Sequence, residues 1–373
     1  MPRGAAQQQR TVCKVINMQN IINRDEKSIF KSRIICMNYV EKINTLLKPA
    51  QAGSPLVLDL FAGCGGLALG FEAQGFETLG FEMDEDCCAT YKKNLSGDCI
   101  QAKLDSNYQF PKAQVVIGGP PCQPFSVGGN QKGIRDARDG FPSFISAIEQ
   151  AKPDVWMFEN VRGLMYKNKD YLDSIITELE AMSYIVEYRL LRAVQYGVPQ
   201  NRERMIVVGH RGSFEFPAAQ THKVTAGDAL RDIAHIVDSD SKFLTPSMDT
   251  YVAKYEKASN CITPRDLHLD RPARTVTCRN LGGATGDMQR VVLPDGRRRR
   301  LTVREGARLQ SFPDWFEFEG KESSRYKQVG NAVPPLMAYE IAASIRNYLN
   351  SPTRLDQETI KSRSNPIQLD LLS

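Results

Sequence analysis

One cysteine in the sequence is placed as a reactive group would be. Cys122 lies within Gly118-Gly-Pro-Pro-Cys-Gln-Pro-Phe-Ser126, directly after the apolar run Gln114–Ile117, which predicts a buried strand. The glycines allow the backbone to approach a ligand, and the prolines stiffen the chain around the cysteine. Because ligands of open α/β sheets bind at the carboxyl ends of strands, Cys122 is a candidate nucleophile. A buried structural cysteine on a tight turn is the alternative.

The segment that follows Cys122 is polar and rich in glycine as far as Gly140. It carries several charges, and Gly128-Gly129 could act as a hinge. This composition is typical of a mobile loop, and we expect the loop to close over a substrate.

A second group of residues has the spacing of a cofactor site. The strand Leu56–Phe61 is followed by Ala62-Gly-Cys-Gly-Gly66 and by a helix predicted over Leu67–Ala73. The next strand, Glu77–Phe81, ends at Glu82, an acid placed to bind a ribose diol. A strand, a glycine turn and a helix N-terminus together favour an adenosine-type cofactor without naming it.

The elements that must position these residues alternate between short apolar strands and helical patterns. Further strands are predicted before Asp105, over Val155–Phe158 with Glu159 at its carboxyl end, and over Met205–Val208. Helices are predicted over Asp25–Leu47, Asp170–Met182, Thr302–Leu309 and Leu336–Leu349, with a tight loop over Tyr326–Asn331 and a turn over Gly282–Gly286. This alternation predicts an α/β fold with a doubly wound, mostly parallel sheet.

Changes in residue composition along the chain divide it into segments. We expect a helical extension over 1–50, a catalytic domain over 51–212, a second, smaller domain over 213–300, a hinge over 301–325, a return to the first domain over 326–350 and a tail over 351–373. Basic residues gather in the smaller domain, although the run Arg297–Arg300 is also what a solvated face would show.

The composition of the chain limits the classes of protein that it could belong to. The 373 residues are 42% apolar and 24% charged, which is typical of a globular protein. No apolar run approaches the roughly 20 residues that span a bilayer, and the N-terminus shows no secretory signal pattern. The nine cysteines are scattered, which favours a reduced cytosolic protein without structural zinc. The net charge of +5 is compatible with a polyanionic partner but does not establish one.

Six motifs occur in an order that a known family shares. They are Asp59-Leu-Phe-Ala-Gly-Cys-Gly-Gly66, Gly119-Pro-Pro-Cys-Gln-Pro-Phe-Ser126, Phe158-Glu-Asn-Val161, Gln200-Asn-Arg-Glu-Arg204, Arg271-Pro-Ala-Arg-Thr-Val276 and Gln328-Val-Gly-Asn331. From Leu56 to Leu349 the chain resembles the C5-cytosine DNA methyltransferases, most of all the bacterial enzymes of restriction–modification systems. The resemblance implies a Rossmann-like fold, S-adenosylmethionine as cofactor, double-stranded DNA as partner and a base-reading region between Arg204 and Arg271.

The resemblance also implies roles for single residues. Cys122 attacks C6 of a flipped-out cytosine as a thiolate, which makes C5 nucleophilic. Glu159, whose pKa we expect to be raised beside the sulfur, protonates N3, while Arg204 contacts O2 and Arg202 organises the Cys–Glu pair. By matching position, the cofactor residues are Phe61, Gly63, Cys64, Gly65, Gly66, Glu82, Met83, Asp105, Pro121, Phe141 and Asn331. Ser126, Gln200, Arg265 and Arg279 are expected to contact DNA, and Lys223, Arg231 and His268 are further candidates for reading bases.

Three other interpretations of the sequence are open. An NAD-dependent oxidoreductase would explain the glycine turn and Glu82 but not Cys122 or Glu159. A catalytically silent DNA-binding regulator would not need the catalytic residues. A tRNA cytosine methyltransferase shares the core motifs, although no Cys-Phe-Thr segment of that branch is present. We expect a monomer in a bacterial cytoplasm; the target sequence, the base that removes the C5 proton and the role of residues 1–50 do not follow from the sequence.

Overall fold

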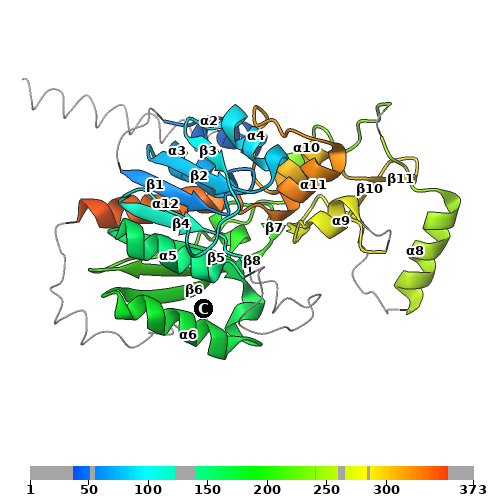
Figure 1. The fold of residues 1–373 in the computed structure, drawn as a ribbon. Coiled ribbons are helices and arrows are strands. Elements are labelled where there is room, and N and C mark those ends of the chain that lie inside the picture. The colour runs from blue at the N-terminus through cyan, green and yellow to red at the C-terminus, as the bar shows by residue number, and fades with distance from the viewer. Residues whose placement is uncertain are drawn as a thin grey trace, which may run out of the picture.

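The computed structural model describes residues 37–50, 55–121, 139–239, 241–258, 265–283 and 286–351, and their main feature is one seven-stranded sheet (Figure 1). In the order β3-β2-β1-β4-β5-β8-β6, its strands are β1 (Leu56–Leu60), β2 (Glu77–Glu82), β3 (Asp98–Gln101), β4 (Val115–Gly118), β5 (Val155–Val161), β6 (Ile185–Arg192) and β8 (Glu203–His210). Neighbours pair in parallel from β3 to β5, and β8 is antiparallel to β5 and β6. The predicted mostly parallel α/β fold is confirmed.

Successive residues of the central strands face two separate apolar cores, as the pleat of a strand requires. In β1, Val57 packs into the core beneath α3 (Gly66–Ala73) and α12 (Pro335–Asn350), whereas Leu58 packs into the core beneath α5 (Phe141–Ala151) and α6 (Lys169–Ala181). Figure 1 shows helices on both sides of the sheet. Burial of both faces explains why these strands are continuous apolar runs in the sequence.

The remaining elements lie around this sheet. The helices are α2 (Tyr39–Leu46), α4 (Glu85–Asn94), α7 (Ala226–Leu230), α8 (Pro246–Ala258), α9 (Cys278–Gly282), α10 (Val303–Leu309) and α11 (Glu322–Asn331), with short 3₁₀ turns η2 (Arg162–Met165) and η3 (Ala193–Tyr196). Two small sheets pair β7 (Gln200–Asn201) with β9 (Ala273–Arg274) and β10 (Arg290–Val292) with β11 (Arg298–Arg300). Among the described residues, no helix is long and apolar enough to cross a membrane.

The tight loop predicted over Tyr326–Asn331 is wrong, because these residues form the end of helix α11. Gly330 suggested a turn, but here it serves a close contact. A Cβ at this position would lie 2.0 Å from the backbone nitrogen of Cys278 and 2.5 Å from the carbonyl carbon of Thr277. The glycine therefore lets α11 pack directly against the start of α9.

The segment 213–300 contains the short helices and strands α7 to β11, and in Figure 1 α8 and the β10–β11 hairpin lie to one side of the large sheet. Arg299, in the basic run, is buried and forms an ion pair of 2.7 Å with Glu305, and Arg290 is buried against Glu256 and Asp266. The interpretation of Arg297–Arg300 as a purely solvent-exposed face is therefore wrong. The division into domains stays a prediction, as do the first part of the N-terminal helix and the tail from 352 onward, which lie outside the described residues.

Candidate active site

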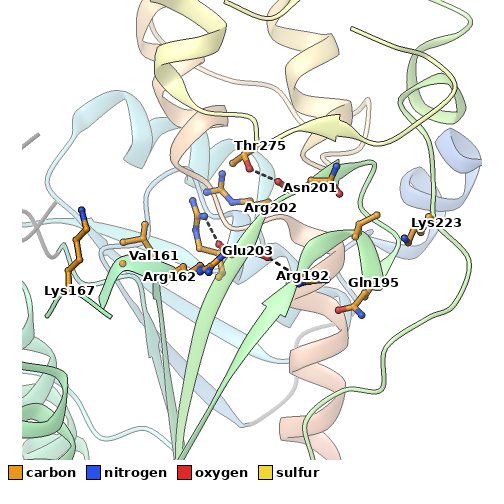
Figure 2. Close-up of a pocket in the computed structure, with 13 residues that line it drawn as sticks. Val161, Arg162, Lys167, Arg192, Gln195, Asn201, Arg202, Glu203, Lys223 and Thr275 are labelled. Carbon is orange, nitrogen blue, oxygen red and sulfur yellow. Dashed lines mark hydrogen bonds and ion pairs between the residues drawn. The ribbon is translucent and has the colours of Figure 1, made fainter. Parts of the chain in front are cut away.

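Three connected cavities open at the carboxyl edge of the sheet, where strand order reverses between β1 and β4. The central cavity, of about 530 Å³, lies over the ends of β1, β4 and β5. It shares Phe61, Glu82, Gly119 and Pro121 with an outer cavity of about 530 Å³. It shares Val161, Arg202 and Arg204 with a groove of about 750 Å³, here called the basic groove for the arginines and lysines that line it (Figure 2). This edge is where a doubly wound sheet binds its ligands.

The glycine turn and Glu82 form one hydrogen-bonded unit at the junction of the outer and central cavities. Gly65 has φ +86°, a left-handed conformation that favours glycine, and it is the N-cap residue of helix α3. One carboxylate oxygen of Glu82 accepts the Gly63 amide at 2.9 Å, and the other accepts the amides of Met83 at 2.8 Å and Asp84 at 2.9 Å. A carboxylate has about four acceptor positions, so roughly one remains for a ligand hydroxyl.

The outer cavity offers an apolar face beside this acceptor. Phe81, Met83 and Leu104 line it, and the Met83 side chain is 65% exposed. Phe61, whose φ is +58°, separates this cavity from the central one. An adenine ring would find apolar contacts here while its ribose reaches Glu82.

Asp59, which lines the central cavity, is a buried acid. It is the first residue of the motif Asp59–Gly66, but the motif did not indicate a role for it. Its side chain is 1% exposed, and neither carboxylate oxygen has a hydrogen-bond partner among the described residues. Burial, with a smaller contribution from Glu82, raises the pKa of this carboxyl well above its usual value. The signal in the sequence was an acid inside an apolar strand. A cationic ligand group in the central cavity would satisfy it, so the cavity fits a cofactor that carries positive charge.

Glu159, on β5, and Arg204, on β8, meet in the wall of the central cavity. They form an ion pair with 2.5 Å between Arg204 Nε and Glu159 Oε1, and both side chains are largely buried. β5 and β8 pair here, which fixes their relative position. The next residue, Asn160, donates to the Pro120 carbonyl at 3.1 Å and so holds the segment that ends at Pro121. Cys122 follows that segment directly, and both it and Ser126 lie outside the described residues.

Gln200 and Arg202 hold a neighbouring segment in place. The Gln200 amide accepts from the Val276 amide at 2.9 Å and donates to the Leu309 carbonyl at 2.7 Å. Arg202 donates to the Val276 carbonyl at 2.8 Å, and burial lowers the pKa of its guanidinium well below the usual value. Gln200 is fully buried, so its side chain does not face a DNA surface in this structure. Both residues are placed to orient the wall of the cavity.

Five of the eleven residues expected at the cofactor do not line the described cavities, namely Gly63, Cys64, Gly65, Asp105 and Phe141. Asp105 is exposed and its carboxylate accepts the Asn107 amide at 2.8 Å. Phe141 is buried in the core, edge-on to the Phe158 ring at 5.1 Å between centroids. Cys64 is buried, and burial raises the pKa of its thiol to about 12, which excludes it as a thiolate at neutral pH. By contrast, Asn331 lines the central cavity as expected.

The two arginines expected to contact DNA share one acid. The Arg265 guanidinium pairs with Asp287 and donates to the Tyr255 hydroxyl at 2.7 Å. The same Asp287 lies 3.4 Å from Arg279, whose side chain is 74% exposed. Arg279 is therefore available to a partner in solution, whereas Arg265 is held within the protein.

Most of the chain matches one protein family. The family described as C-5 cytosine-specific DNA methylase matches residues 56–347, which includes every motif above. The chain belongs to the C-5 cytosine-specific DNA methylase family. It is a DNA cytosine-5 methyltransferase, as the order of its motifs had indicated.

Curated relatives agree with this membership, and a solved structure has a similar fold. The chain is 56% identical to the Type II methyltransferase M.AplI of Arthrospira platensis, over 85% of this chain and 94% of that protein. It is 33% identical to the Type II methyltransferase M.NgoFVII of Neisseria gonorrhoeae, over 79% and 87%. The fold is similar to that of the Entamoeba histolytica methyltransferase EhMeth, with a TM-score of 0.62 and 18% identity over 81% of this chain and 100% of that one. This DNA methylase is thus of the type II kind.

Proposed function

We propose that this methylase transfers a methyl group from S-adenosylmethionine to C5 of a cytosine flipped out of duplex DNA, through a covalent bond between Cys122 and C6. One observation carries the proposal. The central cavity joins Glu159 and Arg204 to the Gly119–Pro121 segment that leads into Cys122, and Asp59 and Glu82 line it as well. A nucleophile, an acid and a cofactor site would therefore surround one space large enough for a base.

The residues of the chain divide the chemistry as follows. C5 of cytosine is a poor nucleophile, so Cys122 adds to C6 as a thiolate and the electron pair of the C5–C6 bond moves toward N3 through the ring. Glu159 delivers a proton to N3, which leaves an enamine whose C5 is nucleophilic. Arg204 leaves its ion pair with Glu159 and holds the cytosine O2. C5 would then take the electrophilic methyl group that the cofactor supplies, with the electron pair of the broken bond staying on the cofactor sulfur. Loss of the C5 proton to a base, departure of the Cys122 thiolate and return of the N3 proton to the Glu159 carboxylate then restore the neutral aromatic ring.

The cofactor assignment is supported by the charge and shape of its two cavities. S-adenosylmethionine supplies an electrophilic methyl group on a positively charged sulfur. Glu82 would accept a ribose hydroxyl, Met83 would pack on the adenine, and Asp59 would face the cationic end. These assignments add Asp59 to the residues that were expected to bind the cofactor.

Replacing Glu82 by glutamine is expected to weaken binding of S-adenosylmethionine about 10- to 100-fold, the equivalent of one hydrogen bond to a charged group. The change removes the charged acceptor that also holds the Gly63 amide. Isothermal titration calorimetry with the cofactor measures the effect. Glu85→Gln, an exposed acid at the start of α4, is the control. A dissociation constant within about twofold of the wild type for Glu82→Gln would contradict the assignment.

The substrate class is tested with tritiated S-adenosylmethionine and either unmethylated duplex DNA of mixed sequence or unmodified tRNA. We expect label in the DNA, recovered as 5-methylcytosine after hydrolysis to nucleosides. Label in tRNA alone would favour the tRNA methyltransferase instead. Since the curated relatives above come from bacteria, we place the enzyme on bacterial DNA, where it would protect host sites in a restriction–modification system. A monomeric state stays a prediction.

A further inference from the structure

Gly140, directly before helix α5, holds one wall of the outer cavity in place. This wall is formed by Gly119, Pro121 and Gly140 and is here called the Pro121 wall. The Gly140 amide donates to the Pro121 carbonyl at 3.1 Å. A Cβ on Gly140 would lie 2.4 Å from Pro121 Cδ and 2.9 Å from Phe61 Cζ, so a larger residue would not fit against the two rings. The position of Gly140 therefore determines the position of the wall.

Asp139 links the chain before Gly140 to helix α6. Its Oδ1 accepts the Phe141 amide at 3.1 Å, and its Oδ2 accepts the hydroxyl of Tyr171, a residue of α6. The Tyr171 ring packs edge-on to the buried Phe141 ring, with 5.8 Å between the centroids. Asp139 lines the outer cavity, yet both of its carboxylate oxygens are held by hydrogen bonds within the protein.

The Pro121 wall is thus held from two directions. From the sheet, Asn160 on β5 donates to the Pro120 carbonyl at 3.1 Å. From the other direction, Gly140 bonds Pro121, and the place of Gly140 depends on Asp139 and the Tyr171 hydroxyl. A hydrogen bond from a hydroxyl to a carboxylate is among the stronger kinds. Its removal would free a carboxylate oxygen beside the cavity and loosen the wall.

We infer that Tyr171 is a positioning residue for cofactor binding: through Asp139 it fixes Gly140 and so the Pro121 wall. The inference rests on the proposed function, since it takes the outer cavity as the site of the adenosine part of S-adenosylmethionine. A wall that already has its bound position in the free enzyme favours binding, because less order is lost when the ligand enters. Tyr171 lines none of the three cavities, so its effect on binding passes through Asp139.

The test is isothermal titration calorimetry of the full chain with S-adenosylmethionine. Tyr171→Phe removes only the hydroxyl and should raise the dissociation constant roughly tenfold, the equivalent of one hydrogen bond to a charged group. Asp139→Ala, which removes both hydrogen bonds, should raise it at least as much. Asp139→Asn should stay within about threefold of the wild type, because its amide can accept from the Phe141 amide and donate to the Tyr171 oxygen.

Tyr184→Phe is the matched control. The Tyr184 hydroxyl also forms a buried hydrogen bond, of 2.7 Å to the Pro153 carbonyl, but that contact lies where β5 begins, whereas the central cavity lies where β5 ends. This variant should lose stability in urea and keep wild-type cofactor binding. Hydrogen–deuterium exchange of the ligand-free enzyme adds a readout without cofactor. The peptide that contains Gly140 should exchange about tenfold faster in Tyr171→Phe and at the wild-type rate in Tyr184→Phe.

The outcomes separate this inference from the proposed function. A dissociation constant of Tyr171→Phe within about twofold of the wild type, in an enzyme that methylates DNA, would overturn the inference alone. An equal loss of binding in Tyr184→Phe would overturn it as well, because general stability would then be responsible. A loss in Asp139→Asn as large as in Asp139→Ala would assign the effect to the charge of Asp139 and not to the wall. A wild type that does not bind S-adenosylmethionine would refute the proposed function, and the exchange at Gly140 would still decide whether Tyr171 holds the wall.

Discussion

Glu159→Gln is expected to lower kcat for DNA methylation by about 10²- to 10⁴-fold, the usual contribution of a positioned general acid. The glutamine amide keeps the size of the side chain but cannot deliver a proton to N3. Binding of S-adenosylmethionine should stay near the wild-type value, because Glu159 is on β5, separated by β4 and β1 from Glu82 on β2, and does not line the outer cavity. Single-turnover assays with saturating DNA and cofactor measure the chemical step directly.

Glu149→Gln, an exposed acid on α5, is the matched control and should retain wild-type turnover. A Glu159→Gln enzyme that keeps kcat within about twofold of the wild type would remove Glu159 from the chemistry. A loss of cofactor binding equal to the loss of turnover would instead show that Glu159 maintains the shape of the cavity.

The largest effect on stability is expected at the ion pair between Arg299 and Glu305. Both side chains are 1% exposed, and the guanidinium makes two hydrogen bonds to the carboxylate, at 2.7 and 2.8 Å. Glu305→Gln leaves a buried arginine without its counter-charge, which is expected to cost about 3–5 kcal/mol in the free energy of unfolding. Urea unfolding followed by tryptophan fluorescence measures the shift of the midpoint.

A surface pair provides the comparison. Glu322 pairs with Lys242 and is 40% exposed, so Glu322→Gln should leave the unfolding midpoint close to that of the wild type. Replacing both Arg299 and Glu305 by apolar residues, as in Arg299→Met/Glu305→Leu, should recover part of the loss, since no unpaired charge remains. Equal midpoints for Glu305→Gln and Glu322→Gln would show that water reaches the Arg299 guanidinium.

Much of the fold could be predicted from the sequence because the signals were local. Apolar runs such as Leu56–Leu60 and Val155–Phe158 are buried on both faces and end at the residues that form the site. β6 was missed, although Val186 and Tyr188 alternate with polar residues as a strand requires. Helix α5 also went unpredicted: its N-terminal Phe141 was weighed as a cofactor contact, whereas the ring belongs to the core.

The parts that could not be predicted depend on contacts between distant residues. Arg290 is buried where it forms ion pairs with Glu256 and Asp266. The sequence near Arg290 does not indicate either partner. Gly330 indicated a turn, but its reason is the approach of Thr277 and Cys278 to helix α11. The basic groove likewise exists only because η2, β6 and the segment before α7 converge.

The covalent step is tested most directly with duplex DNA in which 5-fluorocytosine replaces cytosine. Fluorine cannot leave C5 as a proton does, so an enzyme that has added to C6 and methylated C5 is trapped on the DNA. With radiolabelled S-adenosylmethionine, the expected result is a labelled protein–DNA adduct that survives denaturation and is absent from Cys122→Ser. Methylation of ordinary DNA without any adduct on fluorinated DNA, or an adduct that persists in Cys122→Ser, would contradict attack by Cys122.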